Sequence, residues 1–90
     1  MKYIYTYEEP IKYRDKVRRY EDIEPEVLFD YCRLLLLKND FRLRFVDRKA
    51  RILDTKIMMR SKINIKITDY SLVRVNIEQV REIEHGHVVR

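Results

Sequence analysis

The stretch KINIKITDYSLVRVN, residues 62–76, decides the fold, because apolar residues alternate with polar ones on both sides of a short polar break. A period of two is typical of β-strands with one buried face, so the stretch predicts a hairpin. With a loop at 69–71, three apolar pairs form: Ile67 with Val73, Ile65 with Val75 and Ile63 with Ile77. A shift of the strand pairing by one residue would place lysine and arginine side chains in the core, so the pattern strongly predicts this register.

The segment FRLRFVD, residues 41–47, alternates in the same way and predicts a further strand. Phe41, Leu43 and Phe45 are expected in the core, with Arg42 and Arg44 on the opposite face. Residues 48–61 fit two structures. They form either a helix capped by Asp47, which their Arg, Lys, Ala and Met content slightly favours, or a returning strand that pairs Phe45 with Leu53, Leu43 with Thr55 and Phe41 with Ile57.

Two helices and one more strand are predicted before residue 41. Residues 25–38 begin with Pro25 at the first helical position and carry a wide apolar stripe that ends at Lys38-Asn39-Asp40. Residues 10–21 also begin with a proline, Pro10, and place three apolar residues at helical spacing: Tyr13, Val17 and Tyr20. Residues 2–7 alternate tyrosines with other residues and predict a strand.

These elements predict one small α+β domain over residues 1–90. An antiparallel or mixed sheet of about four strands is expected to lie on two or three helices, with residues 84–90 as a C-terminal tail that can be flexible.

The composition is that of a basic globular protein. Charged residues make up 39% of the 90-residue chain and the formal net charge is +5, which favours a polyanionic partner. No apolar run is long enough for a transmembrane helix, and the N-terminus lacks the apolar core of a secretory signal, so a cytoplasmic protein without a membrane partner is expected. Many charges beside single Gly and Cys residues are typical of hyperthermophiles, and we interpret the chain as the product of an archaeal virus.

No catalytic motif is found in the sequence. One glycine excludes a glycine-rich phosphate loop, and Cys32, as the single cysteine, excludes an intramolecular disulfide. His85 and His87 lack a third metal ligand at a suitable spacing. We therefore expect a non-enzymatic protein with no catalytic residue, cofactor or metal ion.

The predicted pairing gathers positive charge on the sheet face opposite the core. Five cations fall there, and we call them the basic set: Arg42, Arg44, Lys62, Lys66 and Arg74. Such a face binds the phosphate backbone of DNA or RNA, or it simply faces water. We expect the protein to bind nucleic acid. A homodimer is compatible with a chain of this size. A factor from a virus or mobile element that binds a host protein is the alternative.

The element order also resembles two protein families. Strand, two helices and further strands, together with RLRF at 42–45 and the terminal HGHVVR, are similar to RelE-type mRNA endonuclease toxins. That resemblance implies an RNA-cleaving enzyme with candidate residues at five positions: Arg42, Arg44, Arg51, His87 and Arg90. The helix PEVLFDYCRLLLL, followed by a strand, RKARILDTK and a hairpin, is similar in order to Alba-type nucleic-acid-binding proteins.

Overall fold

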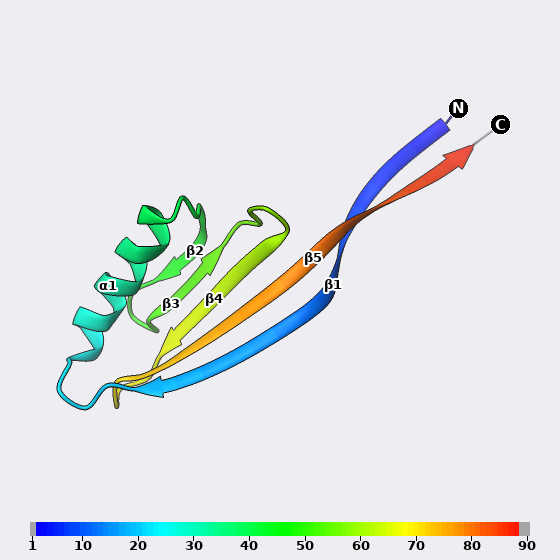
Figure 1. Ribbon diagram of the computed structural model, residues 1–90. Coiled ribbons are helices and arrows are strands. Elements are labelled where there is room, and N and C mark those ends of the chain that lie inside the picture. Colours follow the sequence, from blue (N-terminus) through cyan, green and yellow to red (C-terminus); the bar gives the residue numbers. More distant parts are fainter. Residues whose placement is uncertain (1, 89–90) are drawn as a thin grey trace.

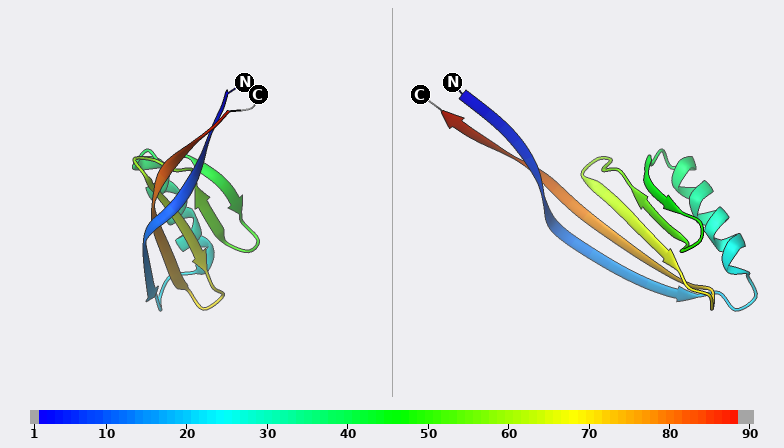
Figure 2. Two further views of the ribbon diagram at one scale, coloured as in Figure 1. Left: turned by 90° about the vertical axis from the view of Figure 1, so that its right-hand side faces the viewer. Right: turned by 180° about the vertical axis from the view of Figure 1, so that it is seen from behind.

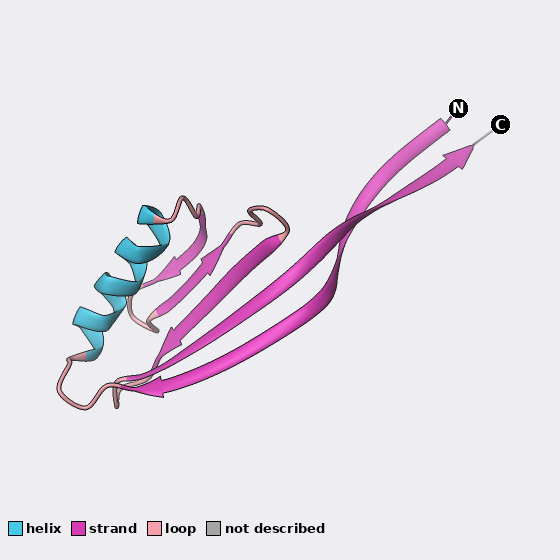
Figure 3. Ribbon diagram, viewed as in Figure 1, coloured by secondary structure: helices cyan, strands magenta, loops and turns pink. Residues whose placement is uncertain are grey.

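A computed structural model describes the backbone of residues 2–88 and the side chains of residues 13–80. Six elements follow one another: β1 (Lys2–Arg19), α1 (Pro25–Lys38), β2 (Leu43–Asp47), β3 (Ile52–Thr55), β4 (Ser61–Ile67) and β5 (Leu72–Val88). The strands form one antiparallel sheet in the order β1-β5-β4-β3-β2, and α1 lies on one of its faces (Figure 1, Figure 3). We call this the helix side and the opposite one the outer face. The α+β architecture thus has five strands and a single helix within the described residues.

The predicted hairpin at 62–76 is confirmed. Ile67 pairs with Val73, Ile65 with Val75 and Ile63 with Ile77, as the alternation requires. Thr68 closes the loop, because its Oγ1 accepts hydrogen bonds from the backbone N–H groups of Tyr70 and Leu72. The hydroxyl of Ser71 donates to the carbonyl oxygen of Ile23, which joins this loop to the start of α1.

The helix predicted over 10–21 is wrong, because β1 continues without a break to Arg19. Tyr13 and Val17 are four residues apart, a spacing that shares one face of a helix and equally one face of a strand. Pairing with β5 along the whole length of β1 satisfies the backbone, so tertiary context overrides the helical pattern. Pro10 fits because β1 is an edge strand, and the register shifts immediately after it.

For residues 48–61 the helix is likewise wrong. The returning strand is confirmed at Ile52–Thr55, with one of its three predicted pairs. β2 and β3 form a hairpin in which Leu43 lies opposite Thr55. A bulge at Arg44 then places Phe45 opposite Asp54 instead of Leu53. The expectation that Phe45 lies in the core is therefore wrong: it belongs to the outer face and is 46% exposed.

The core lies between α1 and the helix side of the sheet. Phe29 and Leu53 are 0% exposed and Ile67 is 1% exposed, and Leu28 and Leu36 complete the helix's buried face. Burial of each such side chain contributes about 1.5–3 kcal/mol. Pro25 begins the helix as predicted, and at its end the Asn39 side-chain amide donates to the carbonyl oxygen of Leu35 at 2.7 Å.

One part of the molecule extends far beyond this core. The pairing between β4 and β5 ends at Ser61 and Gln79. Beyond Gln79, β5 is paired with β1 alone, over the residue pairs from Val80–Pro10 to Val88–Lys2. We call residues 2–10 and 80–88 the ribbon. It projects away from α1, with both chain ends near its tip (Figure 1, Figure 2), and gives the molecule a length of 63 Å. Among the described residues, no helix has the length and apolar character needed to cross a membrane.

Candidate functional site: an apolar groove with a cationic row

The structure brings most of the basic set together on the outer face. Lys62, Lys66 and Arg74 lie there by register, and Arg44 joins them from β2. Arg42 precedes β2 and is exposed, and its carbonyl oxygen accepts a hydrogen bond from the backbone N–H of Lys56 at 2.8 Å.

Three of these cations are paired with carboxylates. Arg44 Nε donates to Oδ2 of the buried Asp54 at 2.7 Å, and Lys62 Nζ lies 3.4 Å from Glu78 Oε2. Arg74 Nη2 donates to Asp15 Oδ2 at 2.7 Å, and this bond raises the pKa of Arg74. Much of the positive charge predicted for this face is therefore neutralised by carboxylates on the same face.

The outer face also holds a small polar pocket of about 290 Å³ among these ion pairs. Asn64 donates to Asp54 Oδ1 at 3.4 Å, and Asn76 Oδ1 is buried without a hydrogen-bond partner among the described side chains. The pocket walls carry both signs of charge, so the pocket presents no concentrated field to a polyanion.

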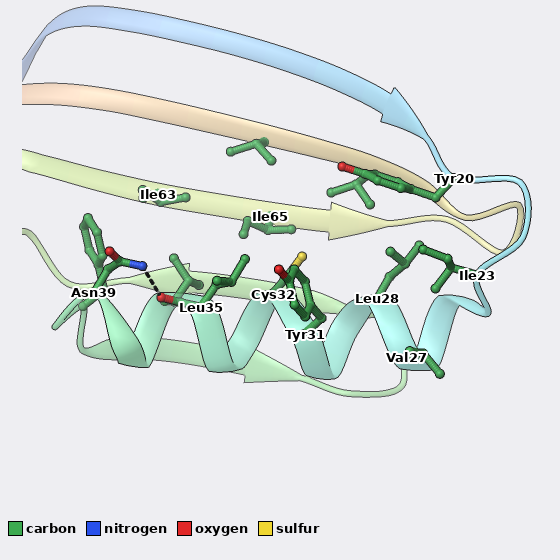
Figure 4. A pocket seen from close by; sticks show the side chains of 14 residues that line it. Tyr20, Ile23, Val27, Leu28, Tyr31, Cys32, Leu35, Asn39, Ile63 and Ile65 are labelled. Atoms are coloured by element: carbon green, nitrogen blue, oxygen red, sulfur yellow. Dashed lines mark hydrogen bonds between the residues drawn. The ribbon is translucent and has the colours of Figure 1, made fainter.

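A larger hollow lies on the helix side, which we call the groove. Its volume is about 570 Å³, and it lies between α1 and strands β4 and β5 (Figure 4). Ile63, Ile65, Val73 and Val75 line the sheet side. Tyr20 and Ile23 stand at one end and Asn39 at the other (Figure 4).

The helix wall of the groove carries apolar side chains that the core does not use. Val27 is 57% exposed, Tyr31 61% and Leu35 39%, and all three line the groove. They are spaced by four residues and so form one stripe along the helix, beside the stripe of the buried Leu28 and the half-buried Cys32. An apolar surface of this kind marks a place where another molecule binds.

Strand β1 adds a row of cations to the same side of the sheet. Arg14 pairs with Ile77, Lys16 with Val75 and Arg18 with Val73, and paired residues share a face. We call these three residues the cationic row. All three are exposed, and no carboxylate among the described side chains lies within ion-pair distance of them.

Arg18 links the cationic row to the groove. Its guanidinium lies 5.1 Å from the centre of the Tyr20 ring, and Tyr20 lines the groove. The groove is thus apolar on its floor and positive along the side formed by β1. The sequence concealed this arrangement, because residues 10–21 were predicted as a helix, and residues spaced by two, such as Arg14, Lys16 and Arg18, share a face on a strand but not on a helix.

Of the residues suggested by the toxin resemblance, Arg51 makes contacts that hold parts of the fold together. Arg51 Nη1 donates to Glu26 Oε1 at 3.1 Å, its Nε donates to the carbonyl oxygen of Ile67 at 3.1 Å, and it is paired with Asp69. These bonds join the β2–β3 turn, α1 and the β4–β5 loop, and they raise the pKa of Arg51. The side chain of His87 and the whole of Arg90 lie outside the described residues. The element order behind the toxin resemblance requires a helix over residues 10–21, and the structure has strand β1 there up to Arg19.

Comparisons with protein-family models, with curated proteins and with solved structures give no match to this chain.

Proposed function

We propose that this protein is a non-enzymatic protein-binding module whose groove takes a polypeptide segment with apolar side chains and carboxylates. The observation behind the proposal is the exposed stripe of Val27, Tyr31 and Leu35 that faces a row of cations across an apolar floor. The apolar side chains would supply affinity, while the cations would select carboxylates and fix the orientation of the segment.

The chemistry of the lining favours a polypeptide over a nucleic acid. Aliphatic side chains make up most of the groove, and its few polar groups come from Asn39, Cys32 and the two tyrosine hydroxyls. Single-stranded nucleic acids bind to grooves that combine cations with aromatic stacking platforms. In this groove Arg18 already covers the ring of Tyr20, and the floor is isoleucine and valine, so the aromatic rings left for stacking are those of Tyr31 and the half-buried Phe41 at the margins.

The helix itself supports binding of a second polypeptide. Of the run Leu34 to Leu37, Leu36 alone is buried, whereas Leu34 is 60% exposed and Leu37 44%. A helix that is apolar on several sides is typical of a position covered by another element. The segment that enters the groove would cover Leu35 directly.

A labelled synthetic peptide tests the proposal by fluorescence anisotropy. The peptide is a 14-residue amphipathic helix with leucines on one face and glutamates on the other, and its partner peptide carries lysines in place of the glutamates. We expect the glutamate peptide to bind and the lysine peptide to bind at least about tenfold more weakly, because the cationic row selects carboxylates.

Tyr31→Glu and Leu34→Glu form a matched pair for the same assay. The two side chains are 61% and 60% exposed on the same helix, but only Tyr31 lines the groove. Binding of the glutamate peptide should be lost in Tyr31→Glu and kept in Leu34→Glu. Equal effects of the two substitutions, or no peptide binding at protein concentrations too low for the chain to associate with itself, would refute the proposal.

Nucleic-acid binding by the outer face is a second candidate, which one observation favours. Lys66 lies directly opposite Arg74 and, unlike Arg74, has no carboxylate within ion-pair distance among the described side chains, so it can contact an anion. A salt-titrated binding assay with duplex DNA, single-stranded DNA and RNA tests it. Binding that falls steeply with salt and is lost in Lys66→Ala with Arg74→Ala supports this candidate, and binding that these substitutions leave unchanged contradicts it.

A further inference from the structure

The ribbon lacks the support that the rest of the sheet has. Val80 donates its backbone N–H to the carbonyl oxygen of Arg60 at 2.8 Å, and beyond this bond no described strand lies beside β5 on the β4 side. The eight residue pairs beyond it, from Glu9–Arg81 to Lys2–Val88, are joined only to each other among the described strands. A two-stranded ribbon with two free edges is marginally stable in water, so this one needs a partner surface.

The composition of the ribbon is the complement of the groove. Its 18 residues include four glutamates, at positions 8, 9, 82 and 84, against one lysine and one arginine. Among the others are Tyr3, Ile4, Tyr5, Tyr7 and Ile83. The chain as a whole has a net charge of +5, so the ribbon is an acidic and apolar segment attached to a strongly basic body.

We infer that the groove of one copy of this chain is filled by the ribbon of a second copy, and the reverse, in a two-fold symmetric dimer. This inference rests on the proposed function and names the partner of the groove. The cationic row of each copy meets the glutamate-bearing ribbon of the other. The ribbon cannot reach the groove of its own chain, because β5 runs straight away from α1 (Figure 1, Figure 2).

The ribbon is longer than the groove wall beside which it would lie. A ribbon of nine pairs is about 30 Å long at about 3.3 Å per residue. Helix α1, which forms one wall of the groove, has 14 residues and is therefore about 21 Å long. Two neighbouring strands are about 10 Å wide, so the part of each ribbon beside α1 covers about 210 Å². Reciprocal contacts then bury about 840 Å² in total, the size of a weak interface.

A charge-swap experiment tests the dimer. In one variant the cationic row is reversed by Arg14→Glu, Lys16→Glu and Arg18→Glu. In the other the ribbon is reversed by Glu8→Lys, Glu9→Lys, Glu82→Lys and Glu84→Lys. We expect the unmodified protein to sediment as a dimer and each variant alone as a monomer. An equimolar mixture of the variants should recover the dimer, because each reversed ribbon then meets a reversed row.

A matched control reverses three exposed cations that lie away from the groove: Arg42→Glu, Lys49→Glu and Lys56→Glu. This control should remain a dimer, and far-UV circular dichroism should show that all variants are folded. Monomers of the unmodified protein at all concentrations, or a mixture that stays monomeric, would overturn the inference. If the glutamate peptide still binds to a monomeric protein, the dimer alone is refuted. If the peptide also fails to bind, the proposed function is refuted as well.

Disulfide trapping gives a second measurement that requires no charge reversal. Cys32 lines the groove and is the only cysteine of the chain, so a cysteine introduced into the ribbon by Thr6→Cys can pair with it. Mild oxidation should yield a covalent dimer on a non-reducing gel. Tyr70→Cys, in an exposed loop, is the control and should stay largely unlinked. Equal cross-linking from both positions would also overturn the inference.

Discussion

Lys16 of β1 and Val75 of β5 lie directly opposite each other on the helix side of the sheet. Val75 lines the groove, and the exposed Lys16 stands beside it at the free edge. The pair shows how the two properties of the site arise from one register: apolar residues on the inner strands and cations on the edge strand. Because Lys16 borders the groove, it should affect which peptides the groove binds.

Replacement of Lys16 by leucine should weaken carboxylate recognition without loss of apolar contact. We expect the glutamate peptide to bind several-fold more weakly to Lys16→Leu, and the difference from the unmodified protein to shrink at high ionic strength, where exposed charges are screened. A peptide with glutamine in place of glutamate should bind both proteins alike. Anisotropy titrations at two salt concentrations measure all of these affinities, and an equal loss for both peptides would contradict the prediction.

Phe29→Ala should cause the largest loss of stability of any single truncation on the helix. Phe29 is 0% exposed, so its removal leaves a cavity and costs about 3–5 kcal/mol of unfolding free energy. Leu34→Ala is the control, because Leu34 is 60% exposed and its truncation should cost no more than about 0.5 kcal/mol. Urea unfolding followed by circular dichroism measures both. Similar costs at the two positions would mean that the helix is rotated from the orientation described.

The turn between β3 and β4 is a place where stability can be gained. Met58 and Ser61 exchange two backbone hydrogen bonds, at 2.8 and 2.9 Å, around a two-residue loop. Both loop residues are left-handed, with φ of 48° at Met59 and 64° at Arg60, as in the hairpin turns that favour Asn-Gly. Met59→Asn with Arg60→Gly should therefore raise the unfolding free energy by about 1–2 kcal/mol.

The control for this turn is Lys56→Gly, because Lys56 is exposed and does not have a positive φ. It should destabilise the protein slightly, since glycine gains conformational freedom in the unfolded chain. Thermal melts of both variants measure the contrast. A turn variant with the same melting temperature as the unmodified protein would argue against the left-handed geometry.

Cys32 should be a slowly reacting thiol with a distinct effect at high pH. Burial raises the pKa of the Cys32 thiol above its ordinary value of 9.0. Its thiolate fraction at pH 8 is therefore small, and alkylation by iodoacetamide should be slower than in the urea-unfolded chain. Above pH 9 the unfolded chain releases this proton first, so the contribution of Cys32 to stability falls as the pH rises.

Cys32→Ala removes that contribution and isolates it from other titrating groups. The difference in unfolding free energy between the unmodified protein and Cys32→Ala should be constant below about pH 8 and should shrink as the pH rises from about 9. Urea titrations at several pH values measure this difference. A difference that grows with pH would contradict the prediction.

Much of the sheet could be read from the sequence, for a physical reason. Two-fold alternation on both sides of residues 69–71 permits one register that buries isoleucine and valine and no lysine, and that register is observed. The limits of α1 were readable too, because Pro25 suits a first turn and Asn39 ends the apolar pattern.

Other features depend on contacts that no local pattern contains. β1 is a strand because it pairs with residues at the far end of the chain. The bulge at Arg44 turns Phe45 outward, and Met59 and Arg60 form a tight turn without the glycine or asparagine that would have indicated it.

The candidate site differs from the predicted one for the same reason. The outer face was correctly predicted as the location of Lys62, Lys66 and Arg74, but two of these cations are neutralised by carboxylates on β5 and β1: Lys62 by Glu78 and Arg74 by Asp15. The cationic row became visible only when Arg14, Lys16 and Arg18 were placed on β1, beside the groove.

The pairing of β1 with β5 also sets the order in which the protein folds. Arg19 pairs with Leu72 and Lys2 with Val88, so the two partners of each pair are 53 to 86 residues apart in the chain. The connections from β2 to β5 are all short hairpins, whose closure costs little chain entropy. We therefore expect α1 and these four strands to assemble first and β1 to join last, in the slow step that contacts of high sequence separation impose. Until that step, the edge of β5 lies open, and a newly made chain is most prone to pair with a neighbour.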